Sequence, residues 1–66
     1  MTDQQREKHI TDLGLLVEGA MGRWEASGCF AARGQADGYR IAMEALINGR
    51  SAAQVASMEK ALGLAA

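Results

Sequence analysis

Apolar side chains recur every three or four positions through the first third of the chain and predict a long amphipathic helix over residues 3–27. Thr2 and Gln5 have the spacing of a capping box at its start, and Gly28 is the residue type that usually follows a helix end. The apolar face comprises Ile10, Leu13, Leu16, Val17, Ala20, Met21 and Trp24. A shallower strip on the opposite side comprises Leu15, Gly19, Gly22 and Ala26. The first helix therefore offers two surfaces to its neighbours.

A charged stripe identifies the second helix. Turning 100° per residue places four side chains on one narrow line, with opposite charges three or four residues apart. They are Arg33, Asp37, Arg40 and Glu44. Glycines in the same segment each lower helix stability by about 1 kcal/mol relative to alanine, but a loop has no reason to keep this register. We therefore predict a helix over residues 30–47 that stops at Asn48-Gly49. Its own strip of small residues comprises Gly34, Gly38, Ala42 and Ala45.

The third helix is short and carries one apolar ridge. Ser51 and Gln54 have the spacing of a second capping box, and the ridge comprises Val55, Met58 and Leu62. Gly63 and Leu64 fit a Schellman ending after a helix over residues 51–62. The chain contains no proline and no alternating apolar run of the kind that forms strands. We predict an all-α protein of two long helices plus a short C-terminal helix, in a single domain over residues 1–66.

The size and composition of the chain favour self-association. A domain of 66 residues is marginally stable, and one Cys and one His supply neither a disulfide nor a zinc cluster. Thirteen of its apolar residues are alanine, so the core is thin. We predict an intertwined homodimer; the alternative is a compact monomeric bundle. Either the small strips or the large ridges of the first two helices pack together. The predicted dimer interface comprises Leu13, Leu16, Val17, Ala20, Met21 and Trp24.

Charge and cysteine content limit the partners that we expect. A net charge of −1 gives no general attraction to nucleic acid or to anionic lipid. The chain has no cysteine pair, no signal-peptide pattern and no apolar run near 18 residues. We therefore expect a cytoplasmic protein that binds neither a membrane nor, directly, nucleic acid.

The candidate catalytic groups are too few and too far apart for an enzyme. His9 and Cys29 lie at opposite ends of the first helix, some 30 Å apart at about 1.5 Å per residue. We expect His9 to be solvated and Cys29 to be a small buried hydrophobe. Glu18 and Glu25 are two turns apart, and no glycine spacing matches a phosphate-binding loop. The sequence thus predicts a non-enzymatic protein without metal or cofactor.

The few aromatic residues and two exposed acidic positions indicate where a partner binds. Trp24 and Phe30 are predicted to anchor the core or the dimer seam. Tyr39 and Met43 form an adaptable apolar patch suited to recognition. With the acidic side chains nearby, the predicted partner-binding residues are Glu18, Tyr39, Met43 and Glu44.

The central stretch from Arg23 to Leu46 reads RWEASGCFAARGQADGYRIAMEAL. Together with the short length, it resembles the small early proteins of Mu-like bacteriophages, and among them the phage quorum-sensing anti-activator proteins. The resemblance implies a helical homodimer in the host cytoplasm that binds the DNA-binding domain of a LuxR-type activator and blocks its access to promoters. It also implies a type IV pilus assembly ATPase as a further target. The alternatives are another anti-host inhibitor, such as an anti-CRISPR protein, and a small transcriptional regulator that itself binds DNA.

Overall fold

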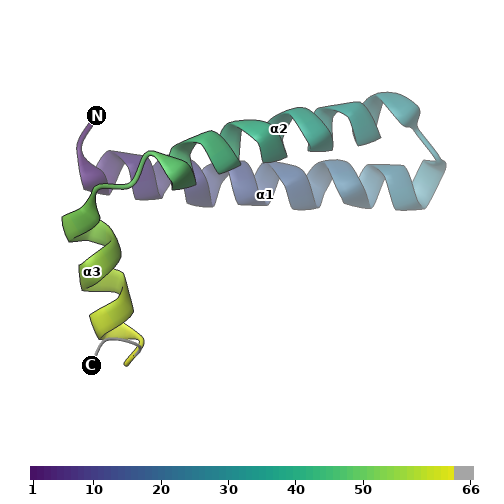
Figure 1. Cartoon of the computed structure of the whole chain (residues 1–66). Helices are drawn as coiled ribbons and strands as arrows, with labels where there is room; N and C mark the ends of the chain where they lie inside the picture. Colours follow the sequence, from purple (N-terminus) through teal and green to yellow (C-terminus); the bar gives the residue numbers. More distant parts are fainter. Residues whose placement is uncertain (64–66) are drawn as a thin grey trace.

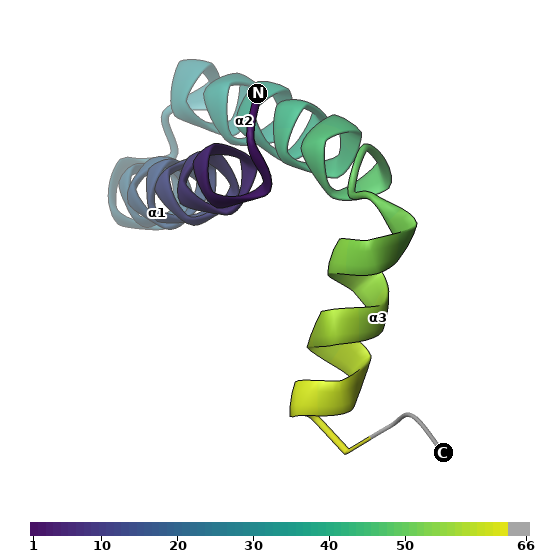
Figure 2. The same cartoon turned by 90° about the vertical axis from the view of Figure 1, so that its left-hand side faces the viewer.

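The computed structural model describes residues 1–63 and contains three helices: α1 (Asp3–Ser27), α2 (Phe30–Asn48) and α3 (Ala52–Ala61). The predicted all-α fold is confirmed, and each helix boundary lies within one residue of its predicted position. α1 and α2 run antiparallel and side by side as a hairpin, whereas α3 leaves the end of α2 and extends past α1 (Figure 1 and Figure 2). The chain is therefore a helical hairpin with a projecting arm.

The two ends of α1 form as their residue types predict. The Thr2 hydroxyl oxygen accepts from the Gln5 amide at 3.1 Å, and the Gln5 side chain accepts from the Thr2 amide at 2.9 Å. This reciprocal pair satisfies two amides that the first turn leaves without partners. At the other end, Gly28 adopts the left-handed conformation, with φ 67°, and its amide donates to the Trp24 carbonyl at 2.7 Å. Gly28 thus turns the chain directly into α2.

The later helix ends are built differently. Gly49 follows α2 as predicted, but its φ is −85°, so the end closes without a left-handed residue. At the start of α3, Ser51 accepts from the Gln54 amide at 3.1 Å. The described residues include only this half of the predicted second capping box. Gly63 is left-handed, with φ 72°, as a Schellman ending requires, while Leu64 lies outside the described residues.

The contact between α1 and α2 follows a heptad pattern. Its positions alternate in steps of three and four residues on each helix. They are Ile10, Leu13, Val17, Ala20 and Trp24 on α1, and Ala32, Ala36, Tyr39, Met43 and Leu46 on α2. Such spacing is typical of helices that cross at a shallow angle in a coiled coil. The fully buried side chains are small: Ala20 and Ala36 are 0% exposed and Ala32 is 3% exposed. Alanines at the seam allow the two helices to approach closely.

The large ridges face each other within the chain, and the small strips face outward. Of the six residues predicted to form the dimer interface, five are buried or half-buried against α2 of the same chain, and the sixth, Leu16, is 47% exposed. The register is seen at Gly14, where an added Cβ would lie 3.9 Å from the Met43 sulfur. The residues of both small strips are exposed. The α1 face predicted for dimerisation thus packs within one chain, because the hairpin places α2 there first.

α3 adds little to the core of the chain. Buried side chains occur in α1 and α2, and α3 contributes none. The radius of gyration is 14.7 Å and the extents are 46 × 25 × 14 Å. A compact chain of this length has a radius of gyration of about 11 Å. The single chain is therefore elongated, unlike the compact bundle considered as the alternative.

Candidate protein-binding surface

Large apolar side chains lie exposed on all three helices. Phe30 is 76%, Leu62 is 72% and Ile41 is 69% exposed. Among residues 1–63 the set is Met1, Leu15, Leu16, Phe30, Ile41, Ile47, Val55 and Leu62. Single exposed apolar residues are normal, but here the large apolar side chains are exposed while the fully buried ones are three alanines. Such a surface favours association with other proteins.

Phe30 and Ile41 share one side of α2, which we call the α2 outer face. They are eleven residues apart, about three helical turns or 16 Å. Ile41 points away from α1, whereas Phe30, the first residue of α2, has its ring against Trp24 of α1 and is still 76% exposed. The exposed charged stripe predicted from the sequence runs along one edge of this face, and Arg40 pairs with Asp37 at 3.7 Å. Small residues, including Gly34 and Ala45, line the other edge. The result is two apolar anchors in a setting of charged and small side chains, a common arrangement at protein interfaces.

Aromatic residues gather at the tip of the hairpin, where α1 turns into α2. The rings of Trp24 and Phe30 are 5.0 Å apart between centroids and tilted by 52°. The Arg33 guanidinium carbon lies 5.4 Å from the centroid of the Trp24 ring. Of the two places expected for Phe30, the core of the chain is wrong, because Phe30 directly follows the hairpin turn and is 76% exposed with its ring against Trp24. Its place in a dimer seam stays a prediction. Aromatic and arginine side chains supply much of the binding energy at interfaces.

The predicted partner-binding residues fall on two different sides. Glu18 and Glu44 are exposed. Tyr39 and Met43 are half-buried at the heptad positions that face α1, so they are part of the hairpin seam. The sequence reasoning missed Phe30 and Ile41 as surface anchors. The available signal was helical register, since Ile41 is two residues from Met43 and therefore points to the opposite side of the helix.

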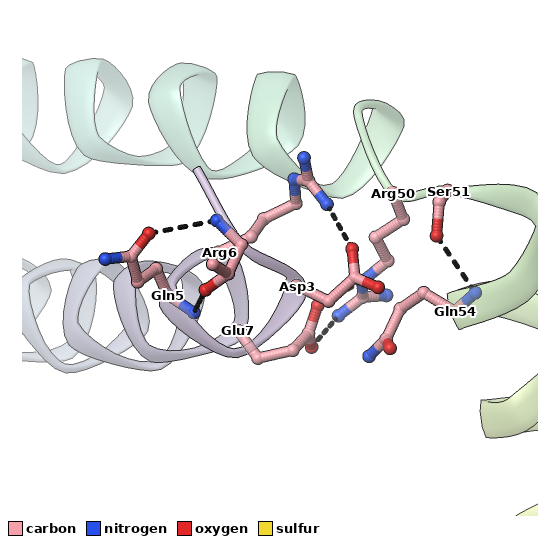
Figure 3. Close-up of polar contacts among 8 residues, drawn as sticks. Asp3, Gln5, Arg6, Glu7, Arg50, Ser51 and Gln54 are labelled. Atoms are coloured by element: carbon pink, nitrogen blue, oxygen red, sulfur yellow. Dashed lines mark hydrogen bonds and ion pairs between the residues drawn. The ribbon is translucent and has the colours of Figure 1, made fainter.

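A bidentate ion pair joins the start of α1 to the segment between α2 and α3 (Figure 3). Arg50 Nη2 and Nε donate to the two Glu7 carboxylate oxygens at 2.7 and 2.9 Å. Hydrogen bonding from Arg50 lowers the pKa of Glu7 below its ordinary value of 4.5, more than partial burial raises it. Glu7 in turn raises the pKa of Arg50. Nothing in the sequence pattern indicates a pair 43 residues apart, which the antiparallel hairpin brings together.

The candidate catalytic residues stay apart. His9 is exposed near the start of α1, as expected. Cys29 is also exposed, at the turn before α2, so the expectation of a buried thiol is wrong. It sits outside because the hairpin turn has no third element packed over it. Within residues 1–63 there is no pocket and no group of three or more residues that could hold a metal ion.

Two further observations concern membranes and similarity to known proteins. Within the described part of the chain, no helix combines the length and the apolar character needed to cross a membrane. Comparisons with protein-family models, curated proteins and solved structures find no match for the chain.

Proposed function

We propose that this protein is a non-enzymatic inhibitor that acts as a homodimer and binds another protein through the α2 outer face. The observation that carries this proposal is the exposure of Phe30 and Ile41, 76% and 69%, on one side of a single helix. A helix with apolar anchors three turns apart fits an apolar groove on a partner. Keeping such side chains in water has no benefit for the isolated chain, whereas burying each on a partner gains roughly 2 kcal/mol.

The target that we propose is the DNA-binding domain of a host LuxR-type transcription activator, so that the inhibitor and the promoter compete for one surface. The resemblance of Arg23–Leu46 to the phage quorum-sensing anti-activator proteins supports this target, and that stretch includes the tip and most of α2. The exposed carboxylates of Glu18, Glu25 and Glu44 also support it, since none has an ion-pair partner among the described residues. Glu44 lies on the charged stripe beside the α2 outer face, while Glu18 and Glu25 lie on α1; together their negative charge attracts the basic surface of a DNA-binding domain.

A gel-shift competition tests the proposal. A LuxR-type activator is bound to a labelled promoter duplex, and the protein is added in increasing amounts. We expect the shifted band to disappear, and Ile41→Glu to raise the half-inhibitory concentration at least about tenfold because it places a charge in the apolar contact. Gln35→Glu is the matched control: it adds the same charge to the same helix away from the α2 outer face, and it keeps an acceptor for Arg23, whose Nη2 donates to Gln35 at 3.0 Å.

Two results would count against the proposal. If the protein leaves promoter binding intact for every LuxR-type activator tested, the proposed target is wrong. If inhibition occurs and Ile41→Glu inhibits as well as Gln35→Glu does, the α2 outer face is not the binding surface.

A further inference from the structure

The apolar ridge of α3 has no cover within the chain. Leu62 is 72% and Val55 is 39% exposed, and Met58 is half-buried. No residue of α3 is buried. A helix of ten residues is marginally stable in water without tertiary contacts, so most of its stability must come from packing of its apolar side. The ridge therefore needs an occupant from outside the chain.

The surface area of the chain indicates a second copy as that occupant. The accessible surface is 4786 Å² for 7.0 kDa, whereas a compact monomer of this mass exposes about 4,000 Å². The excess of roughly 750 Å² is close to the 800 Å² or so that each partner buries in an interface of standard size. One symmetric contact between two copies would thus remove the excess from both.

The receiving surface lies on the side of α1 that faces away from α2, which we call the α1 outer face. It comprises Leu15, Gly19, Gly22 and Ala26, with Leu16 at its edge. Leu15 is 62% and Leu16 is 47% exposed. α3 projects away from the hairpin from the end of α2 (Figure 1 and Figure 2). The strip from Leu15 to Ala26 is about 16 Å long and α3 is about 15 Å long, so their lengths match.

Nothing within the chain requires glycine on the α1 outer face. A Cβ added at Gly22 would meet no atom within 4 Å, and one at Gly19 would meet only the Arg23 guanidinium at 3.7 Å. Both glycines have ordinary helical backbones. Small residues at this spacing allow a second helix to approach closely, and here that helix has to come from another molecule.

We infer that the two copies of the proposed homodimer exchange their third helices: the ridge of each α3 packs on the α1 outer face of the other copy. The contact is isologous, with the same two surfaces used twice. The Arg50–Glu7 pair ties the segment between α2 and α3 to the start of α1, and so fixes the point from which the arm projects. This inference rests on the homodimer of the proposed function and adds its geometry. It leaves the α2 outer face free for a target.

Sedimentation equilibrium on the full chain tests the exchange. Leu62→Lys and Gly22→Glu should each raise the dimer dissociation constant at least about 100-fold, because each buries a charge in both crossings. Ser57→Lys, on the far side of α3, and Gly38→Glu, on the outside of α2, are matched controls and should change it by less than about threefold. Circular dichroism checks the fold, and Gly22→Glu should not lower helicity because glutamate favours helix more than glycine does.

A mixing experiment makes the test specific. In a mixed dimer of Leu62→Lys and Gly22→Glu chains, one crossing is wild type and the other pairs the new lysine with the new glutamate. We expect equimolar mixing to restore dimers that neither variant forms alone. If the wild type is a dimer and both variants dimerise equally well, the exchange is wrong while the homodimer stands. If the wild type is monomeric up to about 100 μM, the dimer itself is wrong, whereas target binding is judged separately by the gel shift.

Discussion

The same substitution should have opposite effects at two glycines of this chain. Gly28 has φ 67°, where an alanine Cβ is strained, so Gly28→Ala should lower the free energy of unfolding by about 1 kcal/mol. Gly38 is helical with nothing within 4 Å of an added Cβ, so Gly38→Ala should raise it by a similar amount. Urea unfolding measures both. If both substitutions changed the free energy of unfolding equally and in the same direction, the left-handed conformation of Gly28 and the helical one of Gly38 would be contradicted.

The Glu7–Arg50 pair predicts a pH dependence of stability. The pKa of Glu7 is lower in the folded chain than in the unfolded one, so the stabilisation is complete above the ordinary pKa of 4.5 and is lost as the pH falls through the folded value. We expect the melting temperature of the wild type to exceed that of Glu7→Gln at pH 7 and the difference to shrink below pH 4.5. Thermal unfolding across pH 2–7 measures it. A difference independent of pH would show that the carboxylate charge is not what stabilises the junction.

At the scale of elements, the α1–α2 seam should not accept larger side chains. Ala36 is 0% exposed between the two helices, and leucine there forces them apart, which should destabilise the hairpin by about 1–3 kcal/mol. Ala45→Leu is the matched control: it makes the same change on the exposed side of α2 and should shift stability by less than about 0.5 kcal/mol. Chemical denaturation compares them, and equal stability of the two variants would contradict the register described above.

The stability of α3 should depend on the helix that packs against it. If its packing partner is a second copy, its amides exchange with solvent quickly in dilute protein and slowly in concentrated protein, while α1 and α2 change less. Hydrogen exchange followed by mass spectrometry measures the difference. The two protein concentrations, about 1 μM and 500 μM, lie below and above the dissociation constants typical of weak dimers. Protection of α3 that does not vary with concentration would mean that the arm is stable by itself.

The helices could be predicted from the sequence, but the faces that meet could not. Caps at Thr2 and Gly28 act within a few residues, so local pattern is sufficient to locate the ends of α1. α1 is apolar on two sides, and the pattern alone does not say which side meets α2. The choice depends on the turn at Gly28, which sets the relative rotation of the helices, and on the closeness that Ala20 and Ala36 allow.

At the scale of the whole molecule, self-association should make stability depend on protein concentration. Dimerisation through the outer face of α1 adds binding free energy to that of folding, so a tenfold increase in concentration should raise the melting temperature by a few degrees. Differential scanning fluorimetry tests this at protein concentrations from about 5 to 500 μM, a range that includes the dissociation constants of typical weak dimers. Leu62→Lys should melt at the same temperature throughout that range. A wild-type melting temperature that is equally constant would contradict self-association.

The candidate surface was only partly accessible to sequence reasoning. Glu18 and Glu44 are exposed as required, but Tyr39 and Met43 are at seam positions, and Phe30 and Ile41 emerge as anchors only once α1 occupies the other side of α2. The Arg50–Glu7 pair depends on the same antiparallel register. The exposed surface consists of the side chains that no other helix covers. Which side chains these are depends on how the helices pack, and the periodicity of a single helix does not determine that.

The exposed thiol of Cys29 is a natural attachment point for a probe that measures distances between copies of the chain. It is the single cysteine of the chain, and the turn that carries it lies at the end of the hairpin opposite α3 (Figure 1). A spin label can therefore be attached to the natural sequence at one defined position per copy. The proposed two-fold dimer would contain two such labels, so pulsed electron resonance should report one sharp distance between them, and titrating a target would show whether that distance changes.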